Sequence, residues 1–396
     1  MTESFSTRAS TPTADIDVCI VGAGAAGASL AYVLGKAGVR TALVDSRTEC
    51  APSFKAEKVE PDQVELFREL GLMHVVEPVA HRIEKVVTAR GRRFVGVAHP
   101  EQYGVHYHDL VNALRGAAAE VSDFVHGRVN DIQTSDSRQR VTLSDGRAID
   151  CRLVVMSAGA TSGKLHQQLG FAKTMISPRH SMAYGFDIEP VGRAHFDFES
   201  ITYMPSRLDQ VVDYVTIFPL PDCVRVNMFM YHAPDDPGVR GLLTDARAEL
   251  QRMVPGLFQL TGDFRISSKV ESFPIDLYVA SSVERAGIVL IGDSFQSVCP
   301  ATGTGLSKVL TDVAVLAKSY IPRWFGGEGV SAESVAGFYR NERKRNTDAY
   351  SLASAGTHRS IATKYSLRYR VHRTKLYTLR AISDLLRFAR VGGSAS

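Results

Sequence analysis

A glycine-rich turn near the start of this 396-residue chain restricts its fold more than any other feature. The apolar run 17–21 (DVCIV) predicts a strand, and Gly22, Gly24 and Gly27 follow it in the spacing G-x-G-x-x-G. Residues 25–45 then predict a helix and a second strand. The first glycine permits the tight turn, the second lets backbone approach a diphosphate, and the third lets helix and strand pack closely. The sequence therefore predicts a dinucleotide-binding β-α-β unit.

Backbone N–H groups and one carboxylate would complete this site. Ala25 and Ala26 open the predicted helix, whose amino end offers unpaired N–H groups and a partial positive charge to phosphates. Asp45 ends the second strand, where an acid can accept hydrogen bonds from ribose hydroxyls. We expect these residues to bind a nucleotide cofactor.

Further local patterns predict the elements that surround this unit. Residues 61–70 and 107–119 have helical periodicity, and residues 141–150 predict a hairpin around Asp145-Gly146. Between residues 182 and 279, alternating segments separated by proline-containing turns predict an antiparallel sheet. Buried strands are predicted at 153–156 and 287–291, and a helix at 305–319.

Composition indicates a soluble enzyme rather than a membrane or nucleic-acid-binding protein. Hydrophobic residues make up 44% of the chain, and no apolar run is long enough to cross a bilayer. Five scattered cysteines predict free thiols and a cytoplasmic location. The polar first fifteen residues predict a disordered leader.

The end of the sequence is strongly basic. Residues 357–396 contain nine Lys or Arg residues and one acidic residue, Asp384. A helical lid or dimer contact is expected there, with recruitment of an acidic carrier protein as the alternative. Because no nucleic-acid recognition module accompanies the charge, no nucleic acid is expected as a partner.

A second glycine-bearing segment, residues 291–316, reads IGDSFQSVCPATGTGLSKVLTDVAVL. It resembles the GD motif of para-hydroxybenzoate hydroxylase-type flavoprotein monooxygenases, GDAAHxxxPxxGxGxNxxxxDAxxL. The matching positions are Gly292, Asp293, Pro300, Gly303, Gly305, Asp312 and Leu316. The resemblance implies that FAD is the cofactor and that Asp293 binds its ribityl hydroxyls. It also implies that backbone N–H groups of the loop from Pro300 through Thr304 to Leu306 face the flavin pyrimidine edge, where negative charge accumulates on reduction.

The resemblance extends over most of the chain. Lys55 falls where the family commonly has an arginine that can neutralise an FAD or NADPH phosphate, and His108 falls where an arginine often contacts the cofactor. An ordinary surface position is the alternative for both residues. Residues 143–160 resemble the family segment that ends in a GADG motif.

Three departures from the family pattern are present. The GADG aspartate is missing, since the sequence reads GATS at 159–162, and this leaves the electron donor open between NADPH, NADH and a partner flavin reductase. Gln296 replaces the usual histidine and Ser307 replaces the usual asparagine. Neither change removes a backbone contact, so FAD binding is still expected.

The family fold is an α/β fold, in which a Rossmann-like FAD-binding domain carries an inserted antiparallel-sheet substrate domain and a C-terminal helical segment. The expected boundaries are 15–80, 105–180 and 282–350 for the FAD-binding domain, 81–104 and 181–281 for the substrate domain, and 351–396 for the basic helical segment.

The implied activity is hydroxylation of a small aromatic or phenolic substrate by molecular oxygen, through a flavin hydroperoxide. Tyr203, Tyr214, Thr216 and Phe218 are the candidate substrate contacts, and the last three share one face of a strand. Packing within the sheet is the alternative for each. No catalytic base is assigned, no metal site is expected, and the oligomeric state is left open.

Other functions on the same scaffold remain in competition. One is a flavin-dependent reductase, dehydrogenase or oxidase, such as the geranylgeranyl reductase-like enzymes. A halogenase is disfavoured, because that family uses a WxWxIP motif and this chain has one tryptophan, Trp324. The last is a non-catalytic FAD-binding protein that acts through its basic C-terminal segment.

Overall fold

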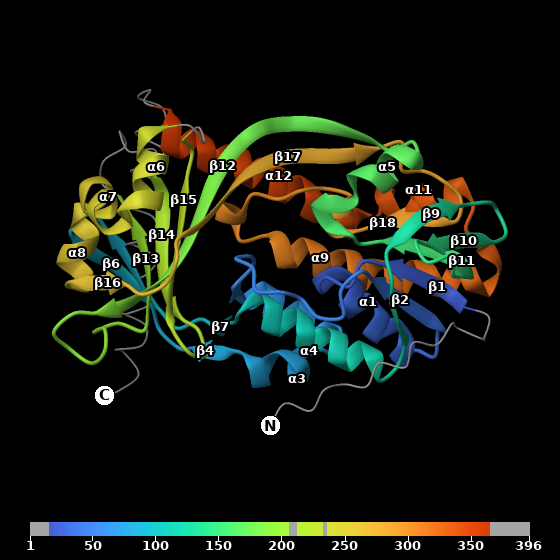
Figure 1. Ribbon diagram of the computed structural model, residues 1–396, viewed down its shortest axis with the longest axis horizontal. Coiled ribbons are helices and arrows are strands. Elements are labelled where there is room, and N and C mark those ends of the chain that lie inside the picture. The colour runs from blue at the N-terminus through green and yellow to red at the C-terminus, as the bar shows by residue number, and fades with distance from the viewer. Residues whose placement is uncertain (1–15, 206–211, 233–235, 365–396) are drawn as a thin grey trace, which may run out of the picture.

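The computed structural model describes residues 16–205, 212–232 and 236–364. In the folded structure of these residues, two sheets lie at opposite ends, and a long two-stranded ribbon arches between them (Figure 1). This α/β architecture, with one mainly parallel and one mainly antiparallel sheet, is the predicted fold class.

The first sheet contains the predicted β-α-β unit. Its strands, in spatial order, are β8 (Asp123–His126), β2 (Thr41–Asp45), β1 (Ile16–Val21), β11 (Ala148–Met156), β10 (Gln139–Leu143) and β9 (Val129–Gln133), with β18 (Ile288–Leu290) also paired to β11. β1 runs parallel to β2 and β11, and β10 and β11 form the predicted hairpin. Apolar side chains cover both faces of β1 because helices and loops pack on each side.

Helices enclose this sheet. They are α1 (Ala25–Lys36), α2 (Pro61–Glu69), α3 (Met73–Val76), α4 (Tyr107–Ala119), α5 (Gly163–Gln168), α9 (Gly305–Val315), α10 (Ile321–Arg323), α11 (Ala332–Arg340) and α12 (Glu342–Thr363). The helical patterns at 61–70, 107–119 and 305–319 are confirmed. A small sheet of β3 (Lys58–Val59), β7 (Gln102–Gly104) and β4 (His81–Ile83) lies between the two larger sheets.

The second sheet is antiparallel except for one strand pair. Its order is β16 (Phe264–Ile266), β12 (Ala172–Pro190), β15 (Val224–Met230), β14 (Val212–Pro219), β13 (Ser200–Met204), β5 (Val86–Arg90) and β6 (Arg93–Ala98), and β17 (Glu271–Ser281) pairs with β12. The parallel pair is β13 with β5. The helices α6 (Pro237–Thr244), α7 (Ala246–Met253) and α8 (Pro255–Thr261) cover one face and were not predicted, because each is too short to show clear periodicity.

Alternation along the central strands separates the two faces of this sheet. Val215 and Ile217 of β14 join the core beneath α6–α8. Tyr214, Thr216 and Phe218 therefore point to the opposite face, toward the first sheet and its cofactor turns. This alternation agrees with the pattern in the sequence.

β12 and β17 form the ribbon at the top of Figure 1, with α12 behind it. The basic C-terminal segment predicted from residue 351 begins within α12, which ends at Thr363, and residues 365–396 lie outside the described residues. The predicted leader, residues 1–15, also lies outside them. No helix in the described part of the chain has both the length and the apolar character to span a membrane.

Candidate active site

The glycines of the fingerprint turn have different surroundings. Gly22 has a φ of +104°, and a Cβ there would lie 2.7 Å from the backbone of Ala158. A Cβ on Gly27 would lie 1.9 Å from the Gly22 carbonyl oxygen. A Cβ on Gly24 would meet, among the described residues, the Tyr107 hydroxyl alone, at 3.7 Å. Packing thus requires the outer two glycines, whereas the middle one leaves backbone open to a ligand.

Asp45 supports this turn from the end of β2. Its Oδ2 accepts hydrogen bonds from the Ala23 N–H at 2.8 Å and from Nη2 of Arg115 at 3.3 Å. Arg115, which is 6% exposed, also donates to the carbonyls of Ala23 and Arg47 at 2.7 and 2.9 Å. Arg115 was not predicted from the sequence. It belongs to no motif, and an arginine in a predicted helix is usually a surface residue.

The second glycine-bearing turn, Gly292–Ser294, follows β18 and lies beside the first. A Cβ on Gly292 would be 3.5 Å from the Cβ of Ala26 in α1. Gly292 has a φ of +58°, and its N–H donates to Asp312 Oδ2 at 2.9 Å. The fold thus brings two turns that are far apart in the sequence to one place.

Asp293 is half-buried where these turns meet. Burial raises the pKa of its carboxyl, while the positive charges of Lys308, Lys55 and Lys173 act in the opposite direction. The Tyr278 hydroxyl fixes the turn by donating to the Asp293 carbonyl at 2.7 Å. A half-buried carboxylate in this position can accept hydrogen bonds from the hydroxyls of a polyol chain.

The loop Pro300–Leu306 leads into α9, whose first-turn N–H groups have no acceptor within the helix. Gly303 adopts a φ of +67°. The Gln63 side chain, from α2, donates to the Gly303 carbonyl at 2.6 Å and to Ser307 Oγ at 3.1 Å. A side chain from another helix therefore contacts the position where the family has asparagine.

A buried group of two lysines and two aspartates lies beneath the second turn. Lys308 and Lys344 place their ammonium nitrogens 3.2 and 2.6 Å from the carboxylate of Asp312. They lie 3.3 and 3.1 Å from the carboxylate of Asp348. Because Asp312 accepts the Gly292 N–H, this charge quartet (Lys308, Asp312, Lys344 and Asp348) supports the turn. In the sequence, Asp312 was noted as a position of the family motif, whereas the other three residues gave no signal.

The remaining departures from the family motifs have structural partners. Gln296 donates to the Asp348 carbonyl at 3.1 Å, which fastens it to α12. The segment Gly159–Ser162, which lacks the family aspartate, forms a turn against Gly292–Ser294, and Gly159 has a φ of +65°.

An aromatic cluster joins the second sheet to the Pro300 loop. The Tyr214 hydroxyl donates to the Ala301 carbonyl at 2.7 Å, and its ring lies 5.0 Å from that of Phe229. Phe54 and Cys299 belong to the same cluster. Burial raises the pKa of the Cys299 thiol to about 11, which fits a packing residue rather than a reactive thiolate.

The other candidate substrate contacts are scattered. Thr216 is buried on the same sheet face as Tyr214, but Phe218 is fully buried in a separate cluster with Ile83. Tyr203 lies on the opposite face, in the core beneath α7 and α8. The structure therefore does not group Tyr203 with Tyr214, because β13 directs this side chain toward the helices.

A polar cluster interrupts the otherwise apolar sheet face. Arg225 bonds to Glu57 Oε1 and Asp187 Oδ1, both at 2.7 Å. Asn227, with its amide oriented to satisfy its neighbours, donates to Glu57. Burial raises the pKa of Glu57 to about 8, although the charge of Arg225 opposes this. Glu57 precedes β3, so the cluster joins the two large parts of the protein.

The two positions suggested for further cofactor contacts, Lys55 and His108, differ. Lys55 is exposed, with Nζ 5.9 Å from the Tyr107 ring centroid, and its charge acts on Asp293. His108 is half-buried, and its Nε2 lies 3.5 Å from Asp109 in the same helix. Lys55 is thus directed toward the cofactor turns, whereas His108 pairs locally.

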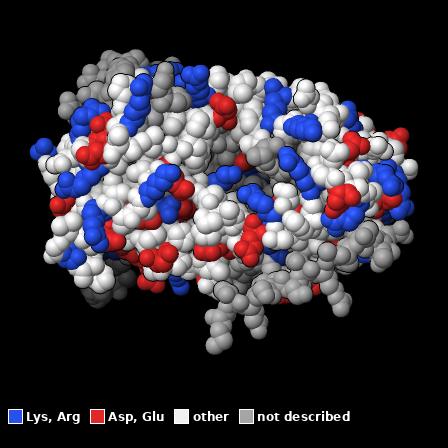
Figure 2. All heavy atoms as spheres, in the orientation of Figure 1, with Lys and Arg blue, Asp and Glu red and all other residues white. Residues whose placement is uncertain are grey.

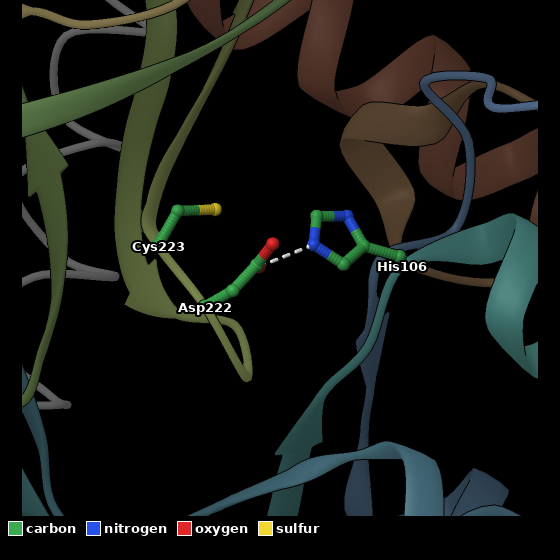
Figure 3. Close-up of side chains that lie close together, drawn as sticks. All are labelled: His106, Asp222 and Cys223. Atoms are coloured by element: carbon green, nitrogen blue, oxygen red, sulfur yellow. Dashed lines mark hydrogen bonds and ion pairs between the residues drawn. The ribbon is translucent and has the colours of Figure 1, made fainter. Parts of the chain in front are cut away.

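His106, Asp222 and Cys223 come together where the turn between β14 and β15 meets the start of α4 (Figure 3). Their ligand atoms lie within 4.8 Å of one another. His106 and Asp222 share a 2.6 Å hydrogen bond, and the Cys223 thiol donates to Asp187 at 3.3 Å. Burial raises the pKa of the Cys223 thiol to about 12.

Comparison with known proteins identifies the family. The FAD-binding domain family matches residues 15–345. The chain belongs to this FAD-binding family. Squalene monooxygenase of Rattus norvegicus is 25% identical over 390 residues, which cover 89% of this chain and 63% of the rat protein. The chain thus spans less than two thirds of that relative. Ubiquinone hydroxylase of Neisseria meningitidis is 21% identical, with 82% and 73% covered.

The fold of this FAD-binding family also matches solved structures. The p-nitrophenol 4-monooxygenase of Pseudomonas putida superposes with a TM-score of 0.74 at 17% identity, covering 96% of this chain and 99% of that one. PqsL of P. aeruginosa gives 0.68 at 19% identity, covering 88% and 96%.

The described residues fit FAD. The open backbone at Gly24 leaves room for a diphosphate, and Asp45 lies at the strand end where a ribose is expected. Asp293 is a half-buried carboxylate beside both turns. These features provide donors and acceptors along the length of a dinucleotide, so FAD is the cofactor of this family member.

Proposed function

We propose that this protein is an FAD-dependent monooxygenase that hydroxylates a small aromatic or phenolic molecule. The observation that carries the proposal is the hydrogen bond from Tyr214 to Ala301. It sets an aromatic sheet face directly against the loop assigned to the flavin. Relatives named as monooxygenases and hydroxylases support the same chemistry.

Each part of the site has one task in this proposal. Backbone N–H groups at Gly24 and Ala25 bind the diphosphate, Asp45 binds the ribose, and Asp293 binds the ribityl chain. The loop Pro300–Leu306 holds the pyrimidine edge. FAD, when bound, supplies the redox chemistry that activates oxygen.

The sheet face holds the substrate and excludes water. Phe54, Tyr214 and Phe229 provide apolar contact for an aromatic ring, and Thr216 provides a hydroxyl on the same face. Excluding water favours transfer of oxygen to the ring over loss of the activated oxygen to solvent. Electrons come from NADPH or NADH in this proposal, with a flavin reductase as the alternative donor. An acidic carrier protein bound by the basic C-terminal segment remains a proposed partner.

Reduction and oxygen incorporation test the proposal separately. The holoenzyme is mixed anaerobically with NADPH or NADH, with and without candidate phenols, and flavin bleaching is followed by stopped flow. Reaction under ¹⁸O₂ should then give a product that carries one labelled oxygen atom. Turnover to a product without the label would contradict the proposal and indicate a reductase, dehydrogenase or oxidase.

A further inference from the structure

Two lysines, Lys55 and Lys173, are close enough to Asp293 for their charges to act on its carboxyl, and each lies near an aromatic ring. Lys55 Nζ lies 5.9 Å from the ring centroid of Tyr107. Lys173 Nζ, at the start of β12, lies 4.3 Å from the ring centroid of Tyr278. The face of the molecule drawn in Figure 2 has a hollow near its middle, with Lys or Arg side chains at the rim of the hollow.

Each aromatic ring is attached to a different cofactor turn. The Tyr107 hydroxyl lies beside the fingerprint turn, 3.7 Å from the position that a Cβ on Gly24 would take. The Tyr278 hydroxyl donates to the carbonyl of Asp293. The lysines are therefore fixed relative to the two turns by independent contacts, one from each part of the site.

Neither ammonium group forms an ion pair with a carboxylate among the described residues. Lys173 is half-buried, and burial lowers its pKa although the charge of Asp293 opposes this. Partial burial of an unpaired cation is unfavourable without a compensating anion. The ammonium group of Lys173 is therefore placed to bind a negatively charged ligand.

We propose that Lys173 binds the diphosphate of FAD from the side opposite Lys55. Lys173 belongs to the ribbon that leads to the second sheet, and not to the dinucleotide-binding unit. The proposal depends on FAD as the ligand and is independent of the reaction that the flavin performs.

Lys173→Met tests this contact, because methionine keeps apolar packing on Tyr278 and removes the charge. The full-length protein is freed of flavin, and binding of FAD and of riboflavin is measured by fluorescence quenching at increasing salt. FAD affinity should fall about tenfold, as for a lost charge-assisted hydrogen bond. Riboflavin, which lacks phosphate, should bind the variant and the wild type equally. Lys173→Arg should retain FAD affinity.

Salt dependence gives a second measurement on FAD alone. As the salt concentration rises, the FAD affinity of Lys173→Met should fall less steeply than that of wild type. The variant lacks one ionic contact that salt would screen. Lys164→Met, an exposed lysine in α5, is the matched control and should behave like wild type.

Unchanged FAD affinity in Lys173→Met, or equal weakening of riboflavin, would overturn the proposal. The second outcome would mean that Lys173 acts through Tyr278 and the Asp293 turn. If the methionine variant fails to fold, Lys173→Gln takes its place, with circular dichroism of the apoprotein as the check. Since no turnover is involved, these results do not depend on whether the enzyme is a monooxygenase.

Discussion

At the scale of single residues, the fingerprint turn separates the demands of folding from those of ligand binding. The space around Gly22 and Gly27 is filled by the protein itself, while Gly24 borders open space. Substitutions at neighbouring glycines should therefore have different consequences, which neither the motif nor its spacing predicts.

Gly24→Val should abolish flavin binding and leave the protein folded. Its side chain would project into the space assigned to the diphosphate, where the Tyr107 hydroxyl is 3.7 Å from the Cβ position. The flavin absorbance of the purified protein, relative to its protein absorbance, measures the loss. Circular dichroism measures the fold.

Gly27→Val is the contrasting variant. Its Cβ would overlap the Gly22 carbonyl at 1.9 Å, so it should lower thermal stability or prevent folding altogether. Full flavin occupancy in Gly24→Val would contradict the assignment of this space.

At the scale of elements, α12 connects the second cofactor turn and the Pro300 loop with the second sheet. Near its start, Lys344 and Asp348 complete the charge quartet. Further along, Ser351 shares a 2.8 Å hydrogen bond with Thr304 of the Pro300 loop, and His358 bonds to Asp213 beside Tyr214 at 2.7 Å. Movement of this helix would thus affect the second turn and the Pro300 loop at once.

Lys344→Met should destabilise the protein by about 3–5 kcal/mol, because it leaves the two carboxylates of the quartet with one buried cation. It should also weaken FAD binding, since Asp312 holds Gly292. Urea denaturation and flavin titration measure the two effects.

The double variant Lys344→Met with Asp348→Asn restores charge balance and should recover part of both losses. If the single variant were as stable as wild type, the quartet would not be a structural support. If the double variant recovered nothing, packing rather than charge would explain the loss.

The elements that were predicted correctly have local signals. The β-α-β unit and the hairpin at 141–150 depend on neighbours in the chain, and the two glycine motifs indicated FAD without the fold. Arg115 and the charge quartet could not be predicted, because they act across elements that come together only on folding. The sequence also could not show that the candidate substrate residues lie on two different sheet faces. This depends on the strand topology, which places Tyr203 on the face opposite Tyr214.

At the scale of the whole molecule, Glu57 joins the cofactor-binding part to the second sheet through Arg225. Its pKa in the folded protein is about 8, against 4.5 for the ordinary group. Between these values the folded protein keeps a proton that the unfolded chain has released. The stability associated with this proton is complete below pH 4.5 and is lost as the pH rises to about 8.

Glu57→Gln should therefore flatten the pH dependence of stability. In wild type, this group lowers the free energy of unfolding by up to about 1.4 kcal/mol per pH unit across the window. Urea denaturation at a series of pH values between 5 and 8 should show a shallower slope for the variant. The exposed Glu65→Gln should keep the wild-type slope. Parallel curves for wild type and Glu57→Gln would show that Glu57 does not hold the proton.

The support of the second cofactor turn by α12 has a consequence for how the protein is made. The fingerprint turn is supported by Asp45 and Arg115, so these contacts become available once Arg115 has been translated. The cations that balance Asp312 include Lys344, which is translated more than 200 residues later. A nascent chain can thus form the turn that receives the diphosphate long before it can secure the rest of the cofactor, so stable flavin incorporation must wait until α12 has emerged.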